Sequence, residues 1–155
     1  MDKKRLTNQF QHNRNLIREA VQITKNEDMK FREFRIAGRQ AAVVFIDGMV
    51  DLTRLQHFIL SPCMQLQKIP ENTGIADYLS SQVLEIASLD KTDQLDMLLM
   101  RICQGDAAVL CDGMEGALIG EVKGYARRSV NQPVNETVVM GPHEGFCETM
   151  RDNVV

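Results

Sequence analysis

Two aspartates in this 155-residue chain stand where carboxylates are able to do chemistry. The apolar run "VVFI" ends at Asp47, the apolar run "AVLC" ends at Asp112, and Gly-Met follows both. Ligands of α/β sheets often bind at the carboxyl ends of strands. Two carboxylates at one such edge are able to hold Mg²⁺ for phosphoryl chemistry. Asp47 and Asp112 are therefore the candidate residues of a magnesium-dependent enzyme.

The rest of the chain favours a turn-forming role for these aspartates. The sequence contains no glycine-rich phosphate loop, and no Ser or Cys nucleophile stands beside a His. A helix is expected after Asp47-Gly48 and a hairpin after Asp112-Gly113, so the two stretches are not copies of one repeat. Asp-Gly often ends a strand because Asp can bond the backbone that follows and Gly tolerates positive φ. We therefore expect turns, no enzymatic activity and no cofactor.

Cysteine and histidine are too scattered to form a zinc site. The cysteines include no C-x-x-C pair, and the few histidines have no metal-ligand spacing. The residues concerned are Cys63, Cys103, Cys111, Cys147, His12, His57 and His143. We expect the cysteines to be reduced packing residues and expect no bound metal.

The net charge of −3 conceals two oppositely charged parts of the chain. Residues 1–39 hold ten Lys/Arg and five Asp/Glu, a net of +5, whereas residues 40–155 hold eight and sixteen, a net of −8. The basic part fits a solvated helix, or an arm that meets an anionic membrane or an acidic partner. Nucleic acid is not an expected partner, because the basic residues are not interleaved with aromatics and the chain is acidic overall.

The chain also lacks the signatures of a membrane span or a secretory signal. No window approaches about 18 consecutive apolar residues, and no apolar region follows the basic residues of "MDKKRLTNQF". These observations predict a soluble, cytoplasmic chain.

Hydrophobic periodicity predicts the elements that position these residues. Helices are expected over residues 9–24 with Asn8 as a candidate N-cap, over 75–87, and from about Thr92 to Cys103. A further helix is expected after its cap Asp51, and Ser61-Pro62 either limits or kinks it. Strands are expected over residues 29–36 at a sheet edge, over 40–46 and 107–111 with both faces buried, and from 117 onward as a hairpin partner. The pattern predicts an α/β fold, or α+β, with a mixed sheet of about four strands covered by helices.

The last part of the chain carries the most specific motif. An arginine, a Pro-x-x-Glu and a Gly-Pro-x-Glu-Gly-Phe-x-Glu follow one another at Arg127 or Arg128, Pro133, Glu136, Gly141, Pro142, Glu144, Gly145, Phe146 and Glu148. This pattern resembles the GerA family of spore germination proteins. "GRQAAVVFIDGMVD" and "GDAAVLCDGMEGALIGEVKGY" resemble that family's early strand and later hairpin, so the likeness covers about residues 30–155. The family often has basic residues around the Gly-Pro, where this chain has Met140 and His143.

The resemblance implies a receptor rather than an enzyme. It implies the cytosolic N-terminal region of a germinant receptor A-type subunit, at the spore inner membrane, which transmits nutrient sensing to ion release. Its implied partners are a B-type membrane subunit and a C-type lipoprotein, and a homo-oligomer is left open. A related family member associated with dipicolinate release and a stand-alone ligand-binding domain are the alternatives. The expected parts are a basic helical segment (1–29), an α/β subdomain (30–126), and a linker that starts a truncated second subdomain (127–155).

Physical reasoning about the motif gives it two roles that the sequence does not separate. Pro133 holds the link extended, Glu136 is spaced to meet Arg127 or Arg128, and Glu144 suits the first turn of a helix. These residues either pin the joint between two subdomains or transmit movement through it.

Overall fold

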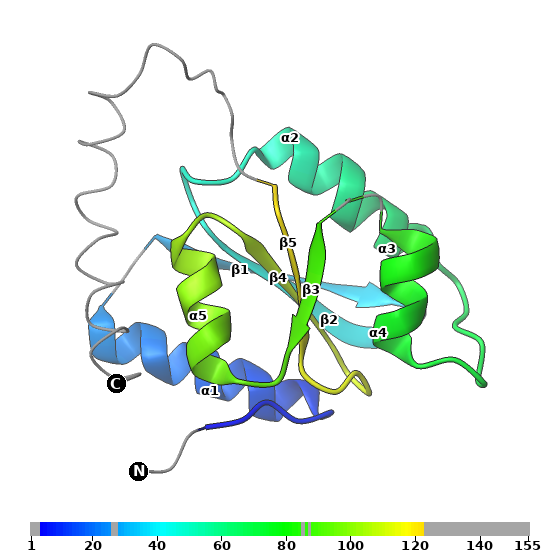
Figure 1. Cartoon of the computed structure of the whole chain (residues 1–155), viewed down its shortest axis with the longest axis horizontal. Helices are drawn as coiled ribbons and strands as arrows, with labels where there is room; N and C mark the ends of the chain where they lie inside the picture. Colours follow the sequence, from blue (N-terminus) through cyan, green and yellow to red (C-terminus); the bar gives the residue numbers. More distant parts are fainter. Residues whose placement is uncertain (1–3, 26–27, 85, 87, 123–155) are drawn as a thin grey trace.

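Five strands form one antiparallel sheet in the order β1-β2-β4-β5-β3. The computed structural model describes residues 4–25, 28–84, 86 and 88–122. The strands are β1 (Met29–Ile36), β2 (Arg39–Ile46), β3 (Leu89–Thr92), β4 (Ala107–Cys111) and β5 (Ala117–Gly120). Strands β1 and β3 are the two edges, and β2, β4 and β5 lie between them (Figure 1).

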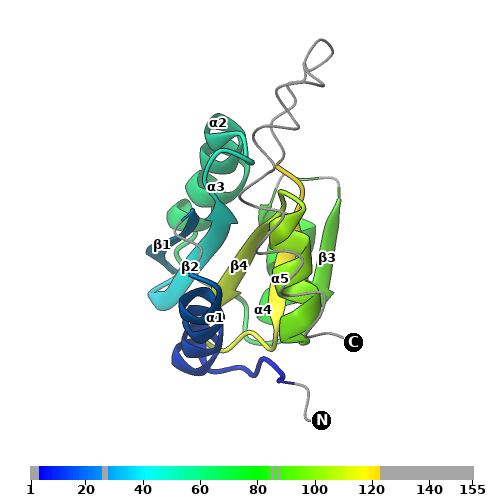
Figure 2. The ribbon, with the colours of Figure 1, turned by 90° about the vertical axis from the view of Figure 1, so that its left-hand side faces the viewer.

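Helices cover both faces of this sheet. Helices α1 (Phe10–Thr24) and α5 (Leu95–Cys103) lie on one face, which Figure 2 shows toward the viewer. The other face carries two helical runs. One comprises α2 (Leu52–Leu55), the π-helical turn η1 (Gln56–Leu60) and α3 (Ser61–Gln65), and the other comprises α4 (Ile75–Tyr78) and the π-helical turn η2 (Leu79–Val83). The result is a three-layer arrangement.

The position of the central strands between two helical layers explains why their sequences are apolar without interruption. Along β2, Ala42, Val44 and Ile46 pack toward α1 and α5. The intervening Ala41 and Val43 pack toward the other helical layer. Successive side chains of a strand point to opposite faces, so a strand with helices on both sides has no polar face. The predicted double burial of β2 and β4 is confirmed.

The α+β form of the expected fold is confirmed, and two details of the sheet differ from expectation. Every strand pairing is antiparallel, because an apolar run reports burial on both faces and not strand direction. The fifth strand is β3, whose four residues "LDKT" are polar and only partly buried at the edge of the sheet. This strand lies where the sequence predicts the approach to a helix at Thr92.

Helix boundaries follow the predicted pattern with three corrections. Gln9, and not Asn8, occupies the N-cap position of α1. Of the two alternatives for Ser61-Pro62, an end of the helix is wrong, because the helical run continues to Gln65 with Pro62 in the first turn of α3 directly after η1. The segment from Ile75 ends at Val83, short of the predicted residue 87, and its C-cap residue Leu84 is extended. The expected edge position of β1 is confirmed.

Candidate functional site

Asp47 and Asp112 lie at opposite ends of the sheet, so they cannot form one metal site. Strands β2 and β4 run antiparallel with Ala41 opposite Cys111. The backbone N–H of Asp112 donates to the carbonyl of Gln40 at 2.8 Å, whereas Asp47 follows the far end of β2. Seven residues of strand separate Gln40 from Asp47, which corresponds to roughly 23 Å. The alternative hypothesis of a shared magnesium site is therefore wrong, because the two strands run in opposite directions.

The turn interpretation of both aspartates agrees with the backbone. Gly48 and Gly113 have φ of 93° and 91°, a region that residues with a Cβ rarely adopt. A hairpin follows Asp112 and a helix follows Asp47, as expected. Asp112 has a second role that the sequence did not show. Its Oδ1 accepts a hydrogen bond from the backbone N–H of Phe10 at 3.0 Å and so caps the first turn of α1.

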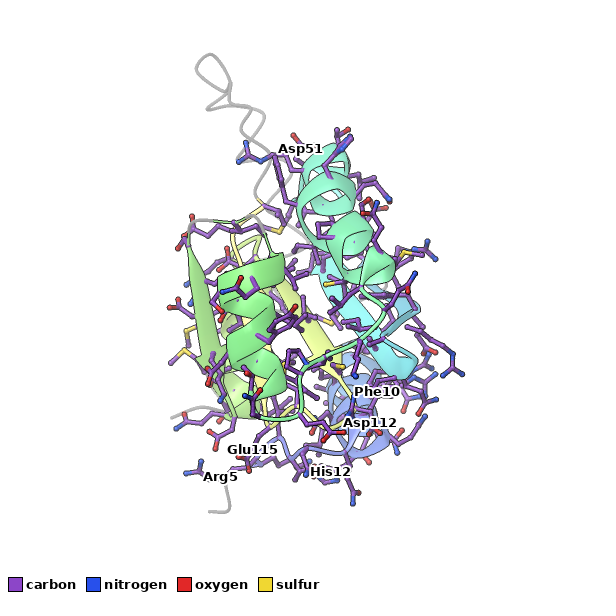
Figure 3. The ribbon with its side chains drawn as sticks, turned by 90° about the vertical axis from the view of Figure 1, so that its right-hand side faces the viewer. Arg5, Phe10, His12, Asp51, Asp112 and Glu115 are labelled. Atoms are coloured by element: carbon purple, nitrogen blue, oxygen red, sulfur yellow. The ribbon has the colours of Figure 1, made fainter. Side chains whose placement is uncertain are left out.

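The N-terminal segment is attached at this same end of the sheet. The backbone N–H of Gly113 donates to the carbonyl of Asn8 at 2.8 Å, and that of Gly116 donates to the carbonyl of Thr7 at 3.1 Å. The fully buried Asn13 side chain accepts from the N–H of Thr7 at 2.8 Å and donates to its carbonyl at 2.9 Å. Figure 3 shows Phe10 and Asp112 close together at this end. Residues 4–9 are thus docked rather than a free arm.

At the opposite end, the last described residues are attached to the start of α2. The backbone N–H of Asp51 donates to the carbonyl of Val122 at 2.8 Å, and Val122 is 1% exposed. Asp51 Oδ1 accepts from the N–H groups of Thr53 and Arg54 at 3.0 and 3.1 Å, which confirms the predicted cap. The chain at Val122 is therefore attached directly to the residue that caps α2. We call the surface of Asp51, Thr53, Arg54, His57 and Phe58 the exit surface.

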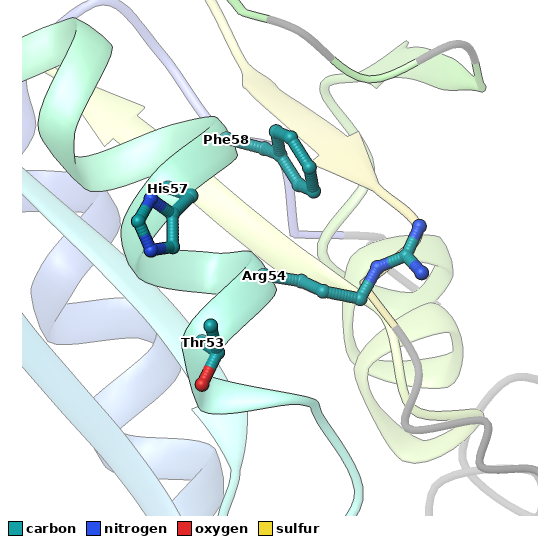
Figure 4. A pocket seen from close by; sticks show the side chains of 4 residues that line it. All are labelled: Thr53, Arg54, His57 and Phe58. Atoms are coloured by element: carbon teal, nitrogen blue, oxygen red, sulfur yellow. The ribbon is translucent and has the colours of Figure 1, made fainter.

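The exit surface contains a hollow of about 440 Å³ lined by Thr53, Arg54, His57 and Phe58. Arg54 and Phe58, one helical turn apart, project in the same direction, and Thr53 and His57 stand on the adjoining side of the helix (Figure 4). The Arg54 guanidinium carbon lies 5.7 Å from the centre of the Phe58 ring, a cation–π contact. This combination of cationic and aromatic groups suits contact with another protein surface better than catalysis.

The described cysteines are the packing residues that the sequence predicts. Cys63, Cys103 and Cys111 are buried and form no disulfide within the described part of the chain, while Cys147 lies outside it. Burial raises the pKa of Cys63 from 9.0 to about 12, with a smaller contribution from Cys111. Burial likewise raises the pKa of Cys111 to about 11. Thiols that hold their protons so strongly are poor nucleophiles at neutral pH.

A second buried polar cluster joins α5 to its neighbours. Arg101 Nε donates to Asp106 Oδ2 at 2.6 Å, and Arg101 Nη1 donates to Asp90 Oδ2 at 2.8 Å. Asp106 is 1% exposed and precedes β4, whereas the Asp90 side chain on β3 is 60% exposed. Desolvation lowers the pKa of Arg101, but the hydrogen bonds that Arg101 donates to Asp90 and Asp106, together with the charges of the two carboxylates, outweigh this effect and raise the pKa overall. The cluster links α5, β3 and the residue that precedes β4.

The predicted coupling motif lies outside the described residues. This applies to Arg127, Arg128, Pro133, Glu136, Gly141, Pro142, Glu144, Gly145, Phe146 and Glu148. The structure shows the place from which the chain leads to them, which is the Asp51–Val122 contact. The exit surface itself was not predicted, because Arg54 and Phe58 belong to no sequence motif. Only the position of Val122 in the fold shows that they lie beside the place where the described chain ends. Within the described ranges, no helix has both the length and the apolar character needed to cross a membrane.

Comparison with known proteins gives one consistent family. The model of the "Bacillus/Clostridium GerA spore germination protein" family matches residues 15–155. Spore germination protein KA of Bacillus subtilis (strain 168) is 25% identical over 91% of this chain and 26% of its own length. Spore germination protein GerLA of Bacillus cereus is 26% identical over 81% of this chain and 26% of its own length. The chain therefore spans about a quarter of the length of these curated relatives.

The fold has a counterpart among solved structures. The crystal structure of the N-terminal domain of the A subunit of the Bacillus megaterium spore germinant receptor GerK3 superposes with a TM-score of 0.62 at 25% identity. The match covers 80% of this chain and 50% of that domain.

Proposed function

This chain belongs to the Bacillus/Clostridium GerA family of spore germination proteins, and we propose that it forms part of the N-terminal domain of a germinant receptor A-type subunit. In this proposal the domain transmits nutrient sensing to ion release and performs no chemistry. The observation that carries it is the agreement between the family match over residues 15–155 and the fold shared with the N-terminal domain of a receptor A subunit.

The two ends of the sheet support a transmitting role. One end is closed by the N-terminal segment and Asp112, and the other holds the exit surface, where Asp51 bonds Val122. The central strands β2, β4 and β5 are almost entirely buried between the two helical layers, and such a close-packed core resists deformation. We propose that the segment from Arg127 to Glu148 couples this body to the next subdomain, with Pro133 keeping the link extended and Glu136 braced by Arg127 or Arg128.

The proposed location and partners follow from the family and from the small share of its relatives' length that this chain covers. We propose that the domain lies at the cytosolic face of the spore inner membrane and assembles with a B-type membrane subunit and a C-type lipoprotein. The curated relatives are about four times as long as the matched region, because it covers 26% of their length. The membrane-spanning part would accordingly be encoded beyond Val155.

The test is genetic and uses the complete gene. The codons after Val155 should continue into several long apolar segments. Spores that lack the gene should fail to release ions in response to at least one class of nutrient, and a full-length copy should restore the response. Normal ion release by deletion spores to every nutrient would contradict a receptor role. Impaired dipicolinate release with every trigger would instead indicate the alternative branch of the family.

A further inference from the structure

Strand β1 leaves one edge of the sheet open over its whole length. All eight of its residues, Met29–Ile36, pair with β2 in one unbroken register, and no described residue pairs with its other side. Figure 2 shows β1 and β3 at opposite edges of the sheet. The unpaired N–H and C=O groups of such an edge are able to bond the backbone of another strand.

The register identifies the backbone groups that face outward. The backbone N–H of Asp47 donates to the carbonyl of Asp28 at 2.8 Å, so the even-numbered residues of β1 are the ones that exchange hydrogen bonds with β2. The odd-numbered residues therefore direct their N–H and C=O groups away from the sheet. These residues are Met29, Phe31, Glu33 and Arg35. Their spacing of two provides the pattern that an added strand requires.

Most features that keep an edge strand from pairing are absent from β1. It contains no proline and no bulge, and it is twice as long as β3, the other edge strand. Phe31 and Phe34 are only half-buried, each packed against the core on a different face of the sheet. The remaining protection is charge, and charge admits a partner of opposite sign.

The charged side chains along this edge are almost all cationic. Lys30, Arg32 and Arg35 are exposed, and none of them forms an ion pair within the described part of the chain. The one carboxylate of the strand, Glu33, accepts a hydrogen bond from Arg14 Nε at 2.6 Å, so its charge is compensated within the domain. The edge therefore presents positive charge that no described carboxylate neutralises.

Protection of the edge does not by itself explain this sign. Charged side chains oppose pairing between edges, and β3 carries both Asp90 and Lys91. Among the described positions, residues 10–39 hold seven Lys/Arg and three Asp/Glu, whereas residues 40–122 hold four and eleven. Like charges opposite each other destabilise a pair of strands, and opposite charges stabilise it. The edge therefore disfavours a second copy of itself and favours an acidic strand.

We propose that the open edge of β1 pairs with an extended acidic segment of a partner protein. The backbone of the segment bonds the odd-numbered residues of β1, and its carboxylates lie opposite Lys30 and Arg32 on one face of the extended sheet. A lipid surface or a nucleic acid would neutralise the cations without using the free backbone groups, whereas an acidic strand uses both. The site shares no residue with the exit surface and does not depend on the proposed transmitting role.

The test is a titration of the 155-residue chain with the peptide acetyl-Thr-Val-Glu-Val-Glu-Val-Glu-Thr-amide, followed by backbone amide NMR. Saturation should slow hydrogen exchange at Met29, Phe31, Glu33 and Arg35, whose amides face solvent in the free chain. The same peptide with Lys in place of Glu should not bind. The acidic peptide with Pro in place of its central Val should bind at least about tenfold more weakly, because Pro has no N–H to donate.

A matched pair of variants tests the position of the site. The double variant Lys30→Gln with Arg32→Gln should weaken binding of the acidic peptide about tenfold, through loss of two cross-strand charge pairs. Lys91→Gln, the same change at an exposed position of the opposite edge strand, should leave binding unchanged. Equal losses in the two proteins would mean that the peptide follows overall charge and not the edge of β1.

Three further results would overturn the proposal. If the acidic peptide leaves exchange at the odd-numbered amides unchanged, no strand is added at this edge. If the Pro-containing peptide binds as tightly, the contact is electrostatic and the backbone groups are not used. If vesicles of phosphatidylglycerol bind the chain and the acidic peptide does not, the basic edge contacts a membrane instead of a protein strand.

Discussion

The role of Asp112 depends on a residue about a hundred positions away in the chain. As the end of β4 it looks like a turn former, and Asp-Gly chemistry predicts no more than that. In the fold, the β4–β5 turn meets the N-terminus of α1, where a carboxylate stabilises both the free N–H of Phe10 and the positive end of the helix dipole. Asp47 has the same local sequence but lies exposed at the other end of the sheet.

This contrast gives a matched pair of substitutions. Asp112→Ala should lower the free energy of unfolding by about 1 kcal/mol through loss of the cap, whereas Asp112→Asn should have little effect because Asn also accepts the bond. Asp47→Ala should cost less than about 0.5 kcal/mol, as expected for an exposed site. Urea denaturation measures all three values. Equal costs for the two alanine variants would show that the bond to Phe10 does not stabilise the fold.

The buried thiols make the free energy of unfolding depend on pH. In the unfolded chain they ionise near 9.0, and in the folded chain Cys63 ionises only near pH 12. Their protons are kept in both states below pH 9, so stability is unaffected there. Above pH 9 the unfolded state loses protons that the folded state retains, so stability falls until the folded pKa is reached.

We therefore expect Cys63→Ala to flatten the decline of stability between pH 9 and 11. The wild-type protein should lose up to about 1.4 kcal/mol more per pH unit than the variant. Urea denaturation at pH 8, 9 and 10 provides the comparison, and the titration of Lys and Tyr is common to both proteins. Parallel pH profiles would mean that Cys63 ionises equally in both states.

At the scale of elements, most of the helices and strands could be predicted because their apolar residues are periodic. The strands β2 and β4 and the helices α1 and α5 all follow from this signal. Strand β3 could not be predicted, because its polar residues reflect an exposed edge and only its pairing with β5 makes it a strand. Strand direction was also beyond the sequence, and with it the separation of Asp47 from Asp112.

Contacts within the sites could likewise be predicted only where the interacting residues are close together in the sequence. The cap by Asp51 could be predicted because its partners are two and three residues away. The attachment of Asp51 to Val122 could not, since the two residues lie far apart in the sequence. The coupling motif remains a prediction from resemblance.

The Arg101 cluster tests how the elements are held together. Asp106→Ala should cost about 3 kcal/mol, because it leaves a partly buried guanidinium without its closest carboxylate. Asp90→Ala removes the exposed partner of the same arginine and should cost less than about 1 kcal/mol. Urea denaturation in low and high salt separates the two contributions to stability, because salt should screen only the exposed ion pair between Arg101 and Asp90. Similar costs for both changes would contradict a buried Arg101–Asp106 link.

At the scale of the whole molecule, the domain is a stiff three-layer body with different attachments at its two ends. The N-terminal segment docks beside Asp112, and the chain leaves beside Asp51, at the other end of the molecule (Figure 3). In our proposal such a body passes on a rotation instead of absorbing it. In our proposal the segment from Arg127 to Glu148 is the joint through which that rotation reaches the rest of the subunit.

The most direct test is nutrient-triggered ion release from spores that carry the full-length subunit with Glu136→Ala or Gly145→Ala. Asp47→Asn serves as a control in the same domain, away from the joint. Loss of an exposed ion pair costs only about 0–1 kcal/mol, so we expect both joint variants to accumulate normally and to release ions more slowly than the control. Subunit abundance is measured in the same spores. Normal release at normal abundance in both variants would contradict the account, and so would loss of the subunit itself, because it would make the joint a folding element.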